Sequence, residues 1–273
     1  MPKPGRRSIR GAASSAGGLI LSAQGYSFEQ VSDWLWRKKK LRVSNSTLHR
    51  WTKEFEVPYL AIRDQNGGET RVVRSWLFTH RGLTYNYQVH LPKLKFCTHE
   101  GLKEYLLNLA ARVDQREFET GRRPSQLELF PNPGVYHAEM GSTLLRQGYG
   151  GQVSRVALDA LRLAKTNRAR HQTLEDYFLS CDRNTIAVEV PVSFHDPGLG
   201  LVAGHLDILQ LNAGKIYLLD FKPDAKREKP EKVITQLTCY ARGLSLRCGI
   251  PMADMRCAWF DEADYFSFRP EWP

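Results

Sequence analysis

Apolar and polar positions alternate most regularly in the second half of the chain. This pattern predicts strands over residues 185–193, 201–211, 215–221, 255–260 and 265–268. Helical spacing covers residues 153–180 and 230–246. Asn212, Ala213 and Gly214 supply turn residues between the second and third strands, which predicts a tight hairpin. This order of helices and strands predicts an α/β fold.

The first 56 residues have helical periodicity instead. After a basic arm over 1–10, helices are expected over 12–24, 28–38 and 44–55, the second beginning at a capping box of Ser27 and Gln30. Two helices joined by a short turn are typical of a helix-turn-helix DNA-binding region, and this segment is similar to those of transposases and resolvases. The candidate DNA contacts are Arg37, Lys38, Lys39, Lys40, Asn45, Ser46, Thr47, His49, Arg50 and Lys53. A structural helical bundle with a solvated basic face is the alternative.

The distribution of charge favours a polyanionic partner. The formal net charge is +10, and residues 1–60 hold eleven Lys or Arg against four Asp or Glu, a surplus of seven. Nucleic acid is the expected polyanion, because a basic surface binds phosphates with release of counterions. A membrane surface has no further support in the sequence.

Residues 57–116 predict a small α+β connector domain, with strands over 59–62, 71–78 and 83–91 and a helix over 98–116. Its aromatic and basic side chains either clamp single-stranded bases or build the core of a small sheet; they are Trp76, Tyr85, Tyr87, Arg71, Arg74 and Arg81. Three prolines and two glycines in 117–135 predict a linker, so a separate domain is expected over 136–273.

Two acidic residues and a lysine interrupt the apolar hairpin. If Ala213 and Gly214 form the loop, Asp207 lies opposite Asp220, and like charges opposite each other destabilise a ladder unless positive charge lies between them. A divalent cation with oxygen ligands is the economical candidate. Asp220 and Lys222 are two positions apart and therefore point to the same face of their strand. A surface hairpin with a simple ion pair is the alternative.

The sequences Gly204-His-Leu-Asp207 and Asp220-Phe-Lys222 resemble the PD-(D/E)XK nuclease superfamily, especially its RecB-like branch. Gln236 and Tyr240, one helical turn apart, match a Gln-x-x-x-Tyr pair that follows in that branch. The resemblance covers about half the chain. It implies a restriction-endonuclease-like core, a mixed sheet flanked by helices, and Mg²⁺- or Mn²⁺-dependent hydrolysis of DNA. Asp207, Asp220, Lys222, Gln236 and Tyr240 would form the catalytic site.

Two further metal ligands are implied by the same resemblance. Glu189 is a lone charge in a strand-like run, where the branch often has an acidic residue; a solvent-facing position on an edge strand is the alternative. His137 follows Gly134 by a few residues, as an additional histidine ligand does in several RecB-like nucleases. His171 and His205 are its competitors.

Several classes of protein are disfavoured. The five cysteines, Cys97, Cys181, Cys239, Cys248 and Cys257, form no Cys-x-x-Cys pair, which argues against a zinc ribbon, a disulfide framework and an iron–sulfur cluster. The chain has no Gly-x-x-x-x-Gly-Lys-Ser/Thr loop for ATP hydrolysis. No run has the length of a transmembrane helix, and the apolar run after Arg6-Arg7 is short for an export signal, so a cytoplasmic protein is expected.

These observations together predict a Mg²⁺- or Mn²⁺-dependent DNA nuclease that is targeted by a helix-turn-helix. Analogy suggests DNA processing in a mobile element, phage or defence system, with other proteins of a DNA-processing complex as partners. A DNA-binding regulator or assembly factor with a non-catalytic nuclease fold is one alternative, and an RNA-directed nuclease is another.

Overall fold

The structure is a computed structural model of the 273-residue chain, and it describes residues 28–40, 42–48, 68–69, 72–130, 137–139, 148–164, 166 and 169–273. Some predicted segments lie outside the described residues. They are the basic arm over 1–10, the helix over 12–24, the strand over 59–62 and most of the third N-terminal helix. None of the helices within them combines the length and the hydropathy needed to cross a membrane.

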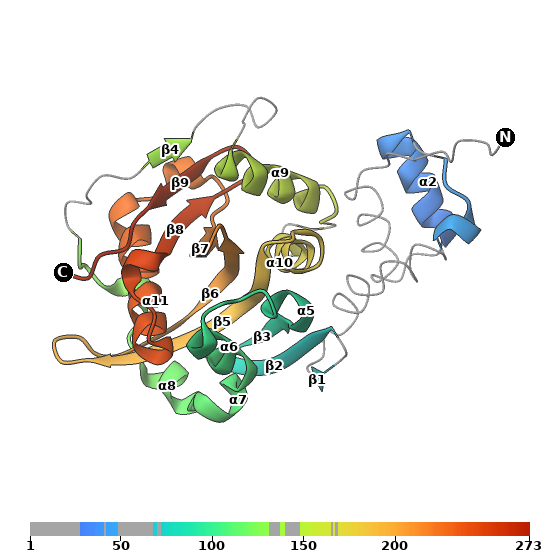
Figure 1. Ribbon diagram of the computed structural model, residues 1–273. Coiled ribbons are helices and arrows are strands. Elements are labelled where there is room, and N and C mark those ends of the chain that lie inside the picture. The colour runs from blue at the N-terminus through green and yellow to red at the C-terminus, as the bar shows by residue number, and fades with distance from the viewer. Residues whose placement is uncertain are drawn as a thin grey trace.

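One mixed sheet organises the described residues (Figure 1). Nine strands lie in the order β1 (Gly68–Glu69), β2 (Val73–His80), β3 (Leu83–His90), β5 (Thr185–Asp196), β6 (Gly200–Asn212), β7 (Lys215–Phe221), β8 (Met255–Phe260), β9 (Tyr265–Phe268) and β4 (His137–Glu139). Neighbours are antiparallel except β7 and β8, which are parallel and are connected by the crossover helix α11 (Pro230–Cys248). The predicted α/β class is confirmed.

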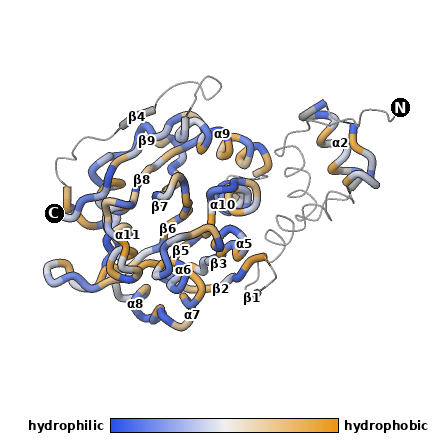
Figure 2. Tube along the Cα trace, in the orientation of Figure 1, coloured by the Kyte–Doolittle hydropathy of each residue, from blue (hydrophilic) through white to orange (hydrophobic). Residues whose placement is uncertain are grey.

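Helices cover both faces of this sheet. Helices α9 (Tyr149–Leu161) and α10 (Arg170–Cys181) share one apolar cluster with Leu219 of β7, whereas α11 shares another with Leu218. Successive strand residues point to opposite faces, which explains this division. Figure 2 shows apolar and polar positions mixed along α9 and α11, as expected for helices that bury one side.

The predicted hairpin turn is confirmed in its register. Asn212 pairs with Lys215, and the ladder continues to Ile208 opposite Leu219. The two loop residues, Ala213 and Gly214, have φ values of 49° and 74°. Positive φ at both central positions is the mark of a type I′ turn, whose twist matches that of the flanking strands.

The predicted separation into a connector domain and a second domain is wrong. Strand β3 pairs directly with β5 through Gln88 and Val188, so residues 72–90 extend the same sheet. Phe78 and Tyr87 share one buried cluster with Leu206 and Trp259. The alternating pattern of β2 and β3 predicts a self-contained sheet, because pairing with a strand about 100 residues away along the chain leaves no local signal.

The described part of the predicted linker, residues 117–130, packs against β6. The backbone N–H of Arg122 donates to the carbonyl of Leu201 at 2.8 Å, and its carbonyl accepts from the N–H of Ala203 at 3.1 Å. A Cβ on Gly121 would lie 2.7 Å from the Cβ of Ala203, so glycine is needed here for close approach. The glycine at this position therefore reflects tight packing.

The single helix predicted over 98–116 is divided into three, α6 (Glu100–Leu107), α7 (Leu109–Arg112) and α8 (Gln115–Thr120). Asp114 starts the last of them by accepting a bond from the N–H of Arg116, and such local capping competes with helix continuation. The remaining short elements are α5 (Leu91–Leu94) and the 3₁₀ turns Pro124–Gln126, Ala225–Arg227 and Met252–Asp254.

Near the N-terminus, helix α2 (Phe28–Lys39) is followed by a turn and by a second helical stretch over 45–48. Val31 and Leu35 of α2 are fully buried. The Ser32 hydroxyl donates to the carbonyl of Val43 at 2.5 Å, which ties the helix to the turn. The Ser44 hydroxyl accepts from the N–H of Thr47 and so caps the second stretch. The candidate contacts His49, Arg50 and Lys53 lie outside the described residues.

Candidate active site

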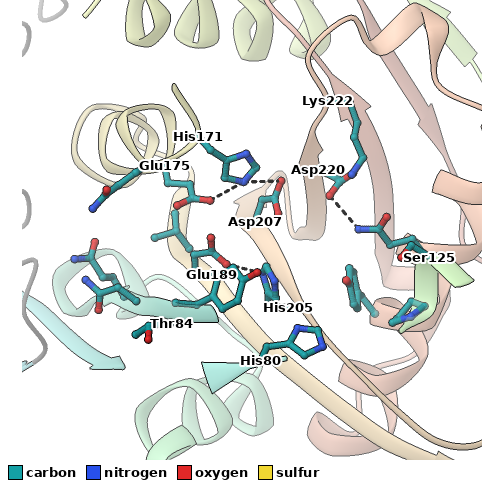
Figure 3. A pocket seen from close by; sticks show the side chains of 18 of the residues that line it. His80, Thr84, Ser125, His171, Glu175, Glu189, His205, Asp207, Asp220 and Lys222 are labelled. Carbon is teal, nitrogen blue, oxygen red and sulfur yellow. Dashed lines mark hydrogen bonds and ion pairs between the residues drawn. The ribbon is translucent and has the colours of Figure 1, made fainter. Parts of the chain in front are cut away.

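A cavity of about 620 Å³ lies beside the central strands. Side chains of β2, β3, α10, β5, β6, β7 and α11 line it, together with residues 123–125 (Figure 3). The structure thereby brings together the five residues predicted as catalytic, two of which were also predicted as metal ligands, and Glu189, a further predicted metal ligand; the five are Asp207, Asp220, Lys222, Gln236 and Tyr240.

Three acidic residues form a row across three adjacent strands. The ladder pairs on either side place Glu189 of β5 opposite Asp207 of β6. The hairpin register, continued by one pair, places Asp207 opposite Asp220 of β7. All three residues are buried: Glu189 is 7% exposed, Asp207 5% and Asp220 1%. Because buried like charges repel each other strongly, this row indicates a place for positive charge.

Glu189 has a backbone conformation that is unusual in a strand, with φ at 50°. A positive φ costs free energy for a residue with a Cβ, and such positions are concentrated at functional sites. The Glu189 carboxylate lies 2.6 Å from Nδ1 of His205. The alternative of an exposed edge position is wrong, because β5 lies between β3 and β6.

Asp207 is held by its own hairpin and by α10. Its Oδ2 accepts a 2.9 Å hydrogen bond from the N–H of Phe221 and lies 3.3 Å from Nε2 of His171. His171 Nε2 also lies 2.9 Å from Oε1 of Glu175. Burial alone would raise the pKa of Asp207, but the neighbouring His171 and Lys222 outweigh it and lower that pKa. The same contacts raise the pKa of His171 against the effect of burial, so an imidazolium is favoured here as long as no cation is bound.

Asp220 and Lys222 form the second half of the site. Nζ of Lys222 lies 2.8 Å from Oδ2 of Asp220. Burial and the facing Asp207 raise the pKa of Asp220 to about 7 despite this ion pair. Burial would lower the pKa of Lys222, but Asp220 and Asp207 raise it, so the ammonium form is retained. Lys222 is therefore a fixed positive charge at the site.

Gln236 of α11 contacts Asp220 directly, and Tyr240 of the same helix contacts Gln236. The Gln236 amide donates to Oδ1 of Asp220 at 3.3 Å and is hydrogen-bonded to the Tyr240 side chain. Tyr240 is buried against Gly204, where an added Cβ would lie 2.8 Å from the tyrosine hydroxyl. A side chain at residue 204 would thus displace Tyr240, which explains the glycine three positions before Asp207.

The residues fit a divalent cation. Ligand atoms of His171, Glu175 and Glu189 lie within 4.8 Å of one another. The buried carboxylate oxygens of Glu175, Glu189 and Asp220 each lie within ion-pair distance of a basic group. Carboxylates with one neutral imidazole suit Mg²⁺ or Mn²⁺.

The backbone of His137 lies far from this row. His137 belongs to β4, which pairs with the outer side of β9, and β8 and β9 separate β4 from β7. Three strand spacings amount to roughly 14 Å, beyond the reach of a shared metal with Asp220. The structure therefore does not bring His137 to the site, and His171 is the histidine that lies beside Asp207.

Some lining residues were not predicted. Glu175 follows His171 by one helical turn, and this i, i+4 spacing of ligand types is a signal the sequence does contain. His80 and Arg123 have no such signal, because they reach the cavity only through the pairing of β3 with β5 and the packing of 121–126 on β6.

Most of the aromatic and basic residues of the middle segment have structural contacts. The hydroxyl of buried Tyr87 donates to the carbonyl of Leu106, and Trp76 stacks on Phe78 at 5.7 Å. Arg74 and Arg81 donate to backbone carbonyls. Tyr85 differs, because its side chain lines the cavity. Arg71 lies outside the described residues.

No protein-family model, curated protein or solved structure matches this chain.

Proposed function

We propose that the chain is a metal-dependent nuclease that hydrolyses phosphodiester bonds of DNA, with a site of the RecB-like PD-(D/E)XK type on a restriction-endonuclease-like core. The observation that carries the proposal is the buried row of Glu189, Asp207 and Asp220 with Lys222 beside it. A protein with a purely structural role has no need of three facing carboxylates, because their repulsion destabilises the fold.

The balance of charge explains why a cation belongs here. Glu175 of α10 adds a fourth carboxyl group beside the row, and burial and the nearby Glu189 raise its pKa well above the usual range. Lys222 pairs with Asp220 and His171 with Glu175, so the basic groups in these contacts are fewer than the carboxyl groups. Asp207, Asp220 and Glu189, which face one another across three strands, would hold Mg²⁺ or Mn²⁺. Glu175 and His171 would border the ion, because their ligand atoms lie within 4.8 Å of one on Glu189. Such an ion, when bound, offsets charge on the reacting phosphate and lowers the pKa of its water.

The chain's own groups have separate tasks. The Lys222 ammonium can donate to a nonbridging phosphate oxygen and stabilise the charge that develops there. Gln236 fixes the orientation of the Asp220 carboxylate, and the Phe221 N–H does the same for Asp207. His171 bridges Asp207 and Glu175 and keeps α10 close to the strands.

The N-terminal helices are proposed to bring the protein to duplex DNA. Arg37 and Lys40 are exposed, and Lys40 and Arg42 lie over the ring of Trp36 at 5.8 and 4.7 Å. The capped stretch after Ser44 presents polar Asn45, which fits the beginning of a recognition helix.

The test is incubation of the purified chain with end-labelled single- and double-stranded DNA and with RNA, in Mg²⁺, Mn²⁺ or EDTA. We expect DNA cleavage with either metal and none in EDTA. Asp220→Asn should abolish it, whereas Asp254→Asn, which alters a carboxylate paired with Lys215 outside the cavity, should not. Cleavage that survives Asp220→Asn would overturn the site, and cleavage of RNA alone would overturn the choice of DNA.

A further inference from the structure

One wall of the cavity is built by residues outside the row of acids. It comprises His80 at the end of β2, Tyr85 of β3 and Arg123 of the segment that crosses β6. In Figure 3 His80 and Thr84 lie across the cavity from Lys222. We refer to His80, Tyr85 and Arg123 as the β2–β3 wall.

A tight turn and hydrogen bonds fix the position of the β2–β3 wall. Arg81 and Gly82, with φ values of 54° and 74°, close the β2–β3 hairpin in a tight turn. The guanidinium of Arg81 donates to the carbonyl of Gly121 at 2.9 Å, and Arg122 pairs with the backbone of β6. The hairpin tip and the 121–126 segment are thus fixed to each other and to the strand that carries Asp207.

His80 is buried but its polar atoms are not satisfied. It is 5% exposed, and neither ring nitrogen has a hydrogen-bond partner among the described residues. Its ring makes edge contacts with Phe118 and His205. Burial, followed by His205 and Arg123, lowers the pKa of His80 to about 4. At neutral pH it therefore offers one N–H donor and one acceptor to a ligand in the cavity.

Arg123 is the cation of the wall. Arg123 is half-buried, and its side chain lines the cavity but forms no ion pair or hydrogen bond with the described part of the chain, although five carboxylates line the same cavity. A guanidinium offers a planar fork that matches two oxygens of a phosphate. An unused fork beside an unsatisfied neutral imidazole is the pattern expected for a nucleotide, with its charged phosphate and its neutral base or sugar.

We propose that the β2–β3 wall is a nucleotide subsite, in which Arg123 binds a phosphate next to the scissile one and His80 bonds to the adjoining base or sugar. The subsite rests on the proposed nuclease function and specifies its substrate as a single strand. Asp207 and Asp220 are buried at the cavity, so the strand must enter it, and 620 Å³ is the volume of a small-ligand pocket. Such a volume accommodates one or two nucleotides and excludes a duplex.

The test measures binding without cleavage. A fluorescein-labelled thymidine hexanucleotide and a blunt DNA hairpin are titrated with full-length protein in EDTA at several salt concentrations, and anisotropy is recorded. Arg123→Gln should weaken hexanucleotide binding about tenfold and reduce the slope of log K against log salt by about 0.7, one single-strand phosphate contact. Arg122→Gln, an exposed neighbour outside the cavity, is the matched control and should leave both unchanged.

His80→Ala supplies a second readout. Because the His80 imidazole is neutral, its loss should weaken binding severalfold without changing the salt slope. Equal effects of the Arg122 and Arg123 variants, hairpin binding that is equally sensitive to Arg123→Gln, or no binding of the hexanucleotide would overturn the subsite. A wild-type chain that binds as described but cleaves nothing in Mg²⁺ or Mn²⁺ would overturn the nuclease and leave the subsite standing.

Discussion

Glu189 lies opposite Asp207 on the neighbouring strand, and it occupies this place with a backbone φ of 50°. Two unfavourable features, a strained backbone and a repelling pair of buried carboxylates, therefore coincide at one position. Neither contributes to the stability of the sheet. Their coincidence indicates that the position is kept for binding.

Glu189→Asn should separate stability from function. Asparagine tolerates a positive φ better than glutamate and removes one of the facing charges, so the free energy of unfolding without metal should rise by about 1 kcal/mol. DNA cleavage should fall to the level of the EDTA control. Urea denaturation and a cleavage assay measure the two effects.

Ala213→Asn is the control for this substitution. Ala213 also has a positive φ, in the turn of the β6–β7 hairpin, but carries no charge. Its replacement should raise stability by a similar amount and leave cleavage intact. A Glu189→Asn variant that is less stable than wild type yet fully active would contradict the role given to residue 189.

Lys215 at the start of β7 and Lys222 directly after it each pair with an aspartate, but only Lys222 lines the cavity. Lys222 lies 2.8 Å from Asp220 in the cavity, whereas Lys215 at the start of the strand lies 2.5 Å from Asp254 outside it. Lys222→Met should reduce the cleavage rate about 100-fold or more, because a preorganised charge beside the phosphate is lost. Lys215→Met should leave the rate within about twofold. Similar rates in the two variants would mean that Lys222 is only a structural ion pair.

The hairpin and the facing positions of Asp207 and Asp220 could be predicted from the sequence, because both depend on local features. The turn at Ala213-Gly214 fixes the register, and register decides that Asp207 faces Asp220. The candidate site was therefore predictable where one hairpin and the following helix form it. Predicting that Glu189 joins these acids requires only that β5 pairs antiparallel with β6.

The rest depended on contacts between segments far apart in the chain. Alternation in β2 and β3 predicts strands but not that Gln88 would pair with Val188, so a separate domain was inferred where the sheet continues. For the same reason His137 was preferred to His171. Choosing between two histidines requires knowing that α10 lies beside β6 and that β4 lies at the far edge.

Metal binding should raise the thermal stability of the folded chain. A ligand that binds only the folded chain stabilises it by about 2.7 kcal/mol at one hundred times its dissociation constant, so Mn²⁺ should raise Tm and EDTA should reverse the rise. Glu175→Gln should reduce the shift, because Glu175 lies in the cluster with His171 and Glu189. Glu231→Gln, in the first turn of α11 and outside the cavity, should not. An unchanged shift in Glu175→Gln would remove Glu175 from the metal site.

Buried His90 should make the fold sensitive to mild acid, independently of the cavity. It is 1% exposed, and burial, followed by the nearby Lys93, lowers its pKa from 6.5 to about 3. Between these values the unfolded chain binds a proton that the folded chain does not, so stability falls as pH decreases below about 6.5. The loss attributable to this group is up to about 1.4 kcal/mol per pH unit.

His90→Asn tests this directly. Nδ1 of His90 accepts from the N–H of Lys93 at the start of α5, and asparagine can replace it there as an N-cap without titrating. The variant should be less stable than wild type near neutral pH because the ring no longer fills its site, but the difference should narrow as pH falls from 6.5 to 4.5. Urea denaturation across this range provides the slopes, with the exposed His195→Asn as control. Parallel slopes for wild type and His90→Asn would show that the burial of His90 does not govern the acid response.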